Sequence, residues 1–395
     1  MPRDAVTPSL LLSPRTNLSR FLARKSAPLS AAEEEATLQA LLAADAENKL
    51  HQRKLYLVLD LDETLVYSRR MEPGATPVGS QIFVRGSPFD MVPRPGLQHF
   101  LQMAERNFVV YLYTMGDQEY TEAVLNVIDP DGRYFRGGVC TWRPTESRQL
   151  KTLKRVLCDR RMALIIDDSI DVWQSDLGNL CFTRRFVGDP DDDGLQRLSG
   201  QLATAHRAFY QAAPDEGFSY DDACAGTPRA SPSVLGVLSE QRGQVLAGCR
   251  ICLTGIVADL NEEKLDEGGV PLGTLLQLYG GQIVLSLEDA THLVARKKDG
   301  WRSSAKIRKS LQRLEKQEEG FYAVWDHWLL DTLASWHRQD EATYSISLED
   351  DEEEEELAVG AQAALAATTT TTGEPDAGGD VDDLVPPRKR MKAEE

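Results

Sequence analysis

The chain has 395 residues, of which 42% are hydrophobic, and its formal net charge is −18 at pH 7. This length suggests two domains with unstructured flanks, because single hydrophobic cores stop growing well below it. A chain with this much negative charge would repel a polyanion at long range. We therefore expect no direct nucleic-acid binding. No apolar run approaches the ~18–20 residues that a membrane-spanning helix needs, so we expect no membrane insertion.

The six cysteines are scattered, and we find no secretory signal. Together these features predict thiols in a reducing compartment rather than a disulfide framework. Cys249 and Cys252 form a C-x-x-C, but no second ligand pair follows at a spacing that suits zinc. The surrounding residues 248–255 are typical of a buried strand, which we favour over a metal or redox site.

The N-terminal half begins with residues 1–30, which are rich in Ser, Pro and Arg and are predicted to be disordered. Leucines among Ala, Glu and Lys predict a helix over 31–54, docked on the domain that follows. Continuous apolar runs at 55–59, 108–113 and 162–166 are typical of parallel strands buried on both faces.

Helical patterns lie between these runs, at 96–106, 118–127 and 150–157. Strands alternating with helices predict a parallel α/β sheet, and we assign residues 31–210 to this domain. Each of the three strands ends in a polar or acidic residue. Ligand sites in such sheets lie beyond the carboxyl ends of the strands, so we expect a site at this edge.

The C-terminal half begins with a loosely composed linker at 211–235, followed by a smaller α/β domain at 236–344. Its predicted strands lie near 251–253, 282–285 and 292–295, and its predicted helices near 272–278, 304–314 and 325–337. Residues 345–395 contain an acidic run, an alanine-rich piece and five threonines, and are predicted to be a disordered tail.

Asp60 and Asp62 follow the first strand directly, in the motif D-L-D-E-T. A carboxylate can attack phosphorus and form an aspartyl-phosphate, which divides ester hydrolysis into two easier steps. A hard cation such as Mg2+ would remove the charge repulsion between this carboxylate and a phosphate dianion. The second aspartate can protonate the leaving oxygen and later activate water. An ordinary acidic loop is the alternative interpretation of the motif alone.

Further polar residues follow the other strands. Thr114 can hydrogen-bond a phosphoryl oxygen, and Asp168 can complete a metal site, with Asp167 available to pair with a cation. Lys151 begins the predicted helix at 150–157 and is a candidate for neutralising the transferring group. The alternative for Lys151 is a solvated helix lysine.

Four motifs in order, D-L-D-E-T-L-V, Y-T-M-G, K-T-L and I-I-D-D followed by D-V-W, resemble the haloacid dehalogenase superfamily. More narrowly, they resemble the RNA polymerase II C-terminal-domain phosphatases that associate with transcription factor IIF. The resemblance covers about residues 45–210. It implies that Asp60 is the nucleophile and a Mg2+ ligand, that Asp62 is the general acid/base and offers its backbone carbonyl to the metal, and that Asp168 is the third ligand.

The same resemblance implies that Thr114 and Lys151 hold the phosphoryl group and that Asp167 orients Lys151. Arg143 lies where the family has an arginine near the substrate phosphate. The motif there departs from the family's usual Ser-Arg-Asp-Glu, which leaves the role of Arg143 open. The short segment between Asp90 and Thr114 leaves no room for a large cap, and an open cleft would suit an extended peptide.

Residues 248–337 resemble a BRCT domain. The motifs that carry this resemblance are T-G after the first strand, G-G before the second, T-H-L-V at the third and a tryptophan in the last helix. In phosphopeptide-binding members a hydroxyl and a downstream lysine hold the phosphate. Thr254 matches the hydroxyl, and Lys306 or Lys309 could be the lysine. A capped turn and a solvated helix face are the structural alternatives.

The basic cluster at 386–392 resembles a nuclear import signal, and the acidic-apolar patch at 380–385 could fold on a partner. We therefore expect a nuclear phosphatase that removes phosphate from phosphoserine in the polymerase heptad repeats. Its expected partners are the phosphorylated C-terminal domain, transcription factor IIF and a protein or phosphopeptide bound by the BRCT domain. A catalytically idle scaffold and a phosphatase of other substrates are the alternatives.

Overall fold

The computed structural model describes residues 30–142, 150–212, 233–258, 260–261, 270–298 and 300–347. The chain forms two compact units. The first comprises residues 1–247, 263–281 and 332–338, and the second comprises 248–262, 282–331 and 339–395. In the part of the chain that the structure describes, no helix is long and apolar enough to cross a membrane. The domain boundaries drawn from the sequence remain predictions.

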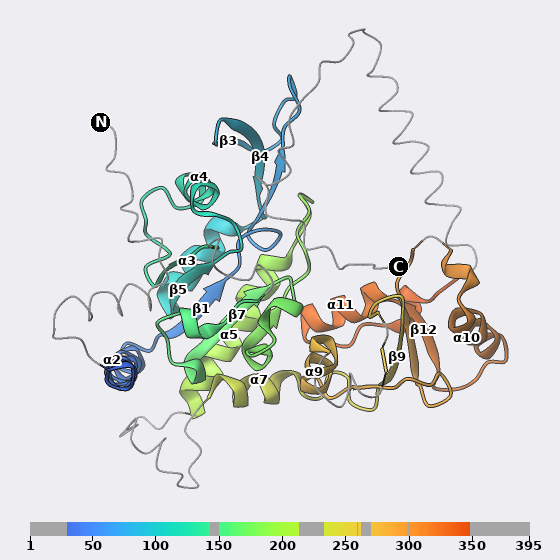
Figure 1. Ribbon diagram of the computed structural model, residues 1–395. Coiled ribbons are helices and arrows are strands. Elements are labelled where there is room, and N and C mark those ends of the chain that lie inside the picture. The colour runs from blue at the N-terminus through green and yellow to red at the C-terminus, as the bar shows by residue number, and fades with distance from the viewer. Residues whose placement is uncertain are drawn as a thin grey trace. The chain divides into compact units, whose positions relative to one another are not determined.

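The first unit is built on a five-stranded parallel sheet in the order β6-β5-β1-β7-β8 (Figure 1). The central β1 is buried at all five positions, as its continuous apolar run predicts. Leu57 of β1 lies beside Val110 of β5 on one side and Leu164 of β7 on the other. The strands are β1 (Leu55–Leu59), β5 (Phe108–Tyr113), β6 (Gly138–Cys140), β7 (Ala163–Asp167) and β8 (Leu180–Phe182).

Helices connect and flank these strands, and several of them begin at a side-chain cap. Ser30 and Glu33 form a capping box at the start of α2, and the Asp117 side chain accepts from Tyr120 N–H at the start of α4. The helices of this unit are α2 (Ala31–His51), α3 (Leu97–Asn107), α4 (Gln118–Ile128), α5 (Gly194–Ala212), α7 (Val234–Arg242) and α9 (Pro271–Leu278).

The helix predicted over 150–157 is wrong. Only a 3-10 turn, η1 (Leu153–Arg155), forms there. The backbone N–H of Lys151 donates to the carbonyl of Val172 at 2.7 Å, and that of Leu153 donates to Asp176 Oδ2 at 3.2 Å. Because these tertiary hydrogen bonds satisfy the backbone, the segment stays extended and fixes the position of Lys151.

The chain between β1 and α3 forms a three-stranded antiparallel sheet that is not predicted from the sequence (Figure 1). We call it the insertion sheet; it comprises β2 (Val66–Arg70), β3 (Ser80–Val84) and β4 (Ser87–Pro93), in the order β2-β4-β3. The buried Asp90 accepts the backbone N–H groups of Val78 and Gly79 and pairs with Arg69. Because β2 begins at Val66, the insertion sheet follows directly on the D-L-D-E-T turn.

The second unit contains a four-stranded parallel sheet in the order β10-β9-β11-β12. Its core includes Cys252, Leu293 and Trp301. Cys249 and Cys252 are buried, which supports the buried-strand interpretation of the C-x-x-C. The elements that begin in this unit are β9 (Arg250–Thr254), β10 (Gln282–Ile283), β11 (His292–Ala295), α10 (Ala305–Glu315), β12 (Tyr322–Trp325) and α11 (Asp326–Ser335), whose residues from Thr332 on belong to the first unit.

Candidate active site

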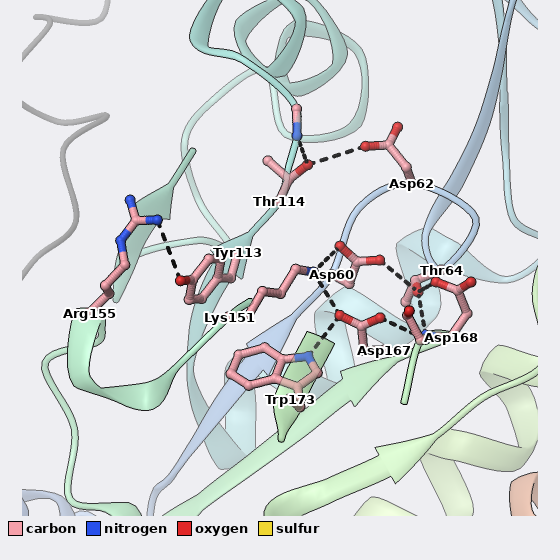
Figure 2. Close-up of polar contacts among 12 residues, drawn as sticks. Asp60, Asp62, Thr64, Tyr113, Thr114, Lys151, Arg155, Asp167, Asp168 and Trp173 are labelled. Carbon is pink, nitrogen blue, oxygen red and sulfur yellow. Dashed lines mark hydrogen bonds and ion pairs between the residues drawn. The ribbon is translucent and has the colours of Figure 1, made fainter. Parts of the chain in front are cut away.

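The polar residues expected at the carboxyl edge of the main sheet lie together in the structure (Figure 2). Asp60 directly follows β1, Thr114 directly follows β5, and Asp167 ends β7 with Asp168 next to it. All four are buried, with Asp60 only 2% exposed and Thr114 and Asp167 fully buried. Buried carboxylates must be paired or bind a cation, since an isolated buried charge is costly.

Lys151 supplies one of these cations. Its Nζ lies 2.5 Å from Asp60 Oδ1 and 2.7 Å from Asp167 Oδ2, and its side chain is fully buried (Figure 2). Asp167 Oδ2 also accepts from Trp173 Nε1 at 2.8 Å, and its Oδ1 accepts from Ser169 N–H at 2.8 Å. These donors fix the Asp167 carboxylate, which in turn directs Lys151 toward Asp60.

Asp60, Asp167 and Asp168 form a cluster that could hold a metal ion, with one oxygen of each within 4.8 Å of the others. Carboxylate oxygens are the ligands that Mg2+ prefers. Both Asp167 oxygens accept from nitrogen donors, Oδ2 from Lys151 and Trp173 and Oδ1 from Ser169, so Asp60 and Asp168 are the better placed side-chain ligands. The donor set therefore fits a hard divalent cation.

Thr64, which the motif D-L-D-E-T contains without an assigned role, connects two of these carboxylates. Its Oγ1 lies 3.2 Å from Asp60 Oδ2 and 3.3 Å from Asp168 Oδ1, and it accepts from Asp168 N–H at 3.2 Å. One hydroxyl proton serves only one acceptor at a time. A cation bound between the two carboxylates would be compatible with this hydroxyl, which can donate to either side.

Arg94 holds the turn that carries Thr64. Its side chain is fully buried, its Nη1 donates to the Thr64 carbonyl at 3.1 Å, and its Nε and Nη2 bind Asp192 at 2.6 and 2.9 Å. This bidentate geometry is characteristic of strong arginine–carboxylate pairs. Arg94 thus connects the D-L-D-E-T turn to the loop before α5.

We expect Arg94→Met to lower the free energy of unfolding by ~3–5 kcal/mol, because it leaves Asp192 without its buried partner and removes the donor to the Thr64 carbonyl. Urea unfolding followed by circular dichroism measures the change. Arg133→Met is the matched control, since Arg133 is 53% exposed and its partner Glu105 is 28% exposed; it should cost under ~1 kcal/mol. Equal effects of the two variants would contradict the role given to Arg94.

Asp62 lies at the more open side of the site and is half-buried. Its Oδ2 accepts from Thr114 Oγ1 at 3.2 Å, and its Oδ1 accepts from the Tyr120 hydroxyl, which also contacts Ser68 Oγ at 2.8 Å. Burial raises the pKa of Tyr120 well above its usual range, and the Asp62 charge adds to this. Sequence reasoning missed Tyr120, whose only signal was its place on the buried face of α4.

Arg185 is a second cation at the site, after Lys151, and it was not predicted from the sequence. Its Nε lies 3.2 Å from Asp168 Oδ2 and 3.0 Å from Glu63 Oε2, and its side chain is 42% exposed. Nothing in the pattern after β8 distinguishes it from its neighbour Arg184. Arg185 adds positive charge at the solvent edge of the carboxylate cluster.

The remaining predicted site residues lie elsewhere. Arg143 is outside the described residues. In the second unit, Thr254 ends β9 and is half-buried, and Lys306 Nζ donates to the neighbouring Leu253 carbonyl at 3.2 Å. Lys309 instead pairs with Glu288 at 3.3 Å on the exposed surface. The geometry therefore favours Lys306 over Lys309 as the companion of Thr254.

Residues 55–212 match the family described as NLI interacting factor-like phosphatase. This domain belongs to that family. The matched range contains the whole carboxylate cluster together with Lys151, Thr114 and Asp62.

Two curated relatives agree with the resemblance predicted from the motifs. RNA polymerase II C-terminal domain phosphatase-like 4 of Arabidopsis thaliana is 27% identical over 293 residues, which cover 64% of this chain and 63% of the relative. An RNA polymerase II C-terminal domain phosphatase of Caenorhabditis elegans is 25% identical over 337 residues, covering 78% of this chain and 48% of the relative. The chain thus spans roughly half to two thirds of the length of these relatives.

A solved structure confirms the predicted fold class. The structure of Fcp1, an essential RNA polymerase II CTD phosphatase, aligns with a TM-score of 0.62 at 21% identity, covering 78% of this chain and 100% of that one. The chain therefore shares the fold of that structure, with a parallel α/β sheet followed by a smaller α/β domain.

Proposed function

We propose that this protein is a Mg2+-dependent protein serine/threonine phosphatase that forms an aspartyl-phosphate on Asp60. The observation that carries the proposal is the buried Asp60 carboxylate held against Lys151, with Asp168 close by and Asp62 at the open side. A nucleophile, a phosphate-neutralising cation and a proton donor are thereby brought to one strand edge, as phosphoryl transfer requires.

In the first step an Asp60 oxygen attacks phosphorus while the bond from phosphorus to the serine oxygen breaks and Asp62 gives that oxygen a proton. Lys151 and Thr114 bind the non-reacting phosphoryl oxygens. In the second step the Asp62 carboxylate takes a proton from water, which attacks phosphorus and frees Asp60 and inorganic phosphate. Mg2+ bound by Asp60, Asp168 and the Asp62 carbonyl would offset the negative charge of the phosphate.

The proposed substrate is phosphoserine in the heptad repeats of the RNA polymerase II C-terminal domain. The names of the relatives support this substrate class. Since the polymerase acts in the nucleus, the basic cluster at 386–392 fits the same proposal as an import signal. Transcription factor IIF remains a proposed partner on the motif resemblance alone.

The first experiment measures phosphate release from heptad-repeat phosphopeptides with and without Mg2+, for the wild type and Asp60→Asn. We expect Mg2+-dependent release that the variant lacks. Release from an aryl phosphate but not from the peptides would keep the chemistry and overturn the substrate. No release from either would favour the alternative of an idle scaffold.

We also propose that the BRCT-like domain binds a phosphopeptide through Thr254 and Lys306, supported by their common location at the end of β9. Fluorescence anisotropy with a phosphopeptide and its unphosphorylated twin tests this. We expect Lys306→Met to remove the preference for phosphate and Lys309→Met to retain it. An equal loss in both variants would indicate general charge attraction instead.

A further inference from the structure

The two carboxylate oxygens of Asp62 are held from different elements. Tyr120 of α4 donates to Oδ1, while Thr114, at the end of β5, donates to Oδ2 (Figure 2 shows the Thr114 contact). Tyr120 is 1% exposed and Thr114 is fully buried, whereas Asp62 is half-buried. Asp62 is therefore partly exposed, whereas the two side chains that contact it are enclosed by protein.

The Tyr120 hydroxyl is fixed by more than its contact with Asp62. It also contacts Ser68 of β2 at 2.8 Å, and Tyr120 itself lies in the first turn of α4, which Asp117 caps. Asp117 further pairs with Arg85, between β3 and β4, at 2.9 Å. The insertion sheet and α4 thus hold the hydroxyl from two directions.

Gly116 permits this arrangement. A Cβ at this position would lie 2.8 Å from Tyr120 Cδ1 and 3.1 Å from Thr114 Oγ1. Its N–H donates to Thr114 Oγ1 at 2.8 Å. Thr114 and Tyr120 can therefore both approach Asp62 because position 116 has no side chain.

We propose that Tyr120 is a positioning residue that occupies Oδ1 of Asp62 and so leaves Oδ2 to exchange the proton with the leaving group and with water. The inference rests on the proposed function. Oδ2 is the oxygen beside Thr114, which binds the phosphoryl group in that mechanism. When Thr114 turns to the phosphoryl oxygen, Oδ2 is released beside the breaking bond.

The proton count follows from this assignment. Asp62 Oδ2 gives its proton to the serine oxygen as the phosphorus–oxygen bond breaks and the bond to Asp60 forms. The same Oδ2 then takes a proton from the attacking water. Tyr120 keeps its own proton throughout, so it affects only the orientation of the Asp62 carboxyl group.

The test uses two leaving groups on the full chain. Serine leaves as a strongly basic alkoxide and needs the proton, whereas nitrophenolate is a weak base and needs little help. We expect Tyr120→Phe to lower kcat/KM about 10- to 30-fold for a phosphoserine peptide and under about threefold for p-nitrophenyl phosphate. Asp62→Asn removes the acid itself. It therefore gives the upper limit for the ratio between the loss of kcat/KM on the phosphoserine peptide and the loss on p-nitrophenyl phosphate.

Tyr113→Phe is the matched control. This substitution keeps the aromatic ring and removes only the hydroxyl, which lies 3.4 Å from both Thr152 N and Arg155 Nη1. We expect it to change both substrates by the same factor. Ser68→Ala, a second perturbation that leaves Tyr120 in place, should shift the ratio in the same direction as Tyr120→Phe but less.

Equal losses on both substrates in Tyr120→Phe and Ser68→Ala would overturn the positioning role while leaving the phosphatase assignment intact. A wild type that releases phosphate from neither substrate would instead overturn the proposed function. Thermal unfolding of each variant shows whether a loss of activity comes from a loss of the fold. If Tyr120→Phe does not fold, the ratio of the two activity losses in a folded Ser68→Ala variant still tests the positioning role.

Discussion

Lys151→Met is expected to abolish phosphate release and to lower the free energy of unfolding of the Mg2+-free protein by ~3–5 kcal/mol. The variant leaves Asp60 and Asp167 facing each other without the ammonium group that now lies 2.5 and 2.7 Å from their oxygens. These carboxylate side chains are 3% and 0% exposed, so solvent cannot screen them. Chemical denaturation in EDTA measures the loss of stability.

Mg2+ should restore part of the stability lost in Lys151→Met but none of the activity, because the ion can neutralise the carboxylates without replacing the lysine's contact with the phosphoryl group. Lys154→Met is the matched control, since Lys154 is an exposed lysine three residues along the same segment. It should change neither quantity. A Lys151→Met variant as stable as wild type in EDTA would contradict the buried ion-pair account.

The sequence predicted those elements whose signal is local. Residues 55–59 and 108–113 are continuous apolar runs, and both form strands with those bounds. The helix predicted at 150–157 failed because its leucines and lysines favour a helix, whereas hydrogen bonds to Val172 and Asp176 determine the backbone. Local pattern carries no information about partners some twenty residues away.

The candidate site shows the same contrast between residues that a local pattern predicts and residues that only tertiary packing brings together. Asp60, Thr114 and Asp168 were found because each follows a strand, and parallel strands bring their carboxyl ends to one edge. Tyr120 contacts Asp62 across 58 residues of sequence, and Arg185 reaches Asp168 from the loop after β8. The insertion sheet was missed because its short strands lack a continuous apolar run. These contacts depend on packing between elements.

Asp60→Asn is expected to lower phosphate release by ~10³-fold or more, since the amide is a poor nucleophile. Its stability in EDTA should change little. At an effective dielectric constant of about 20, the attraction of Lys151 is roughly 6 kcal/mol, and the repulsions from Asp167 and Asp168 are roughly 3–4 kcal/mol each. Loss of the Asp60 charge removes both, and they nearly cancel.

The response to Mg2+ then separates the chemistry from the fold. Wild type should gain ~2.7 kcal/mol at a Mg2+ concentration about 100 times its Kd, whereas Asp60→Asn, lacking one anionic ligand, should gain much less. Asp193→Asn, which alters an exposed aspartate paired with Arg197, should respond as wild type does. Mg2+-dependent turnover above about 1% of wild type in Asp60→Asn would show that another group is the nucleophile. The strand-end carboxylate would then serve only to bind the metal ion.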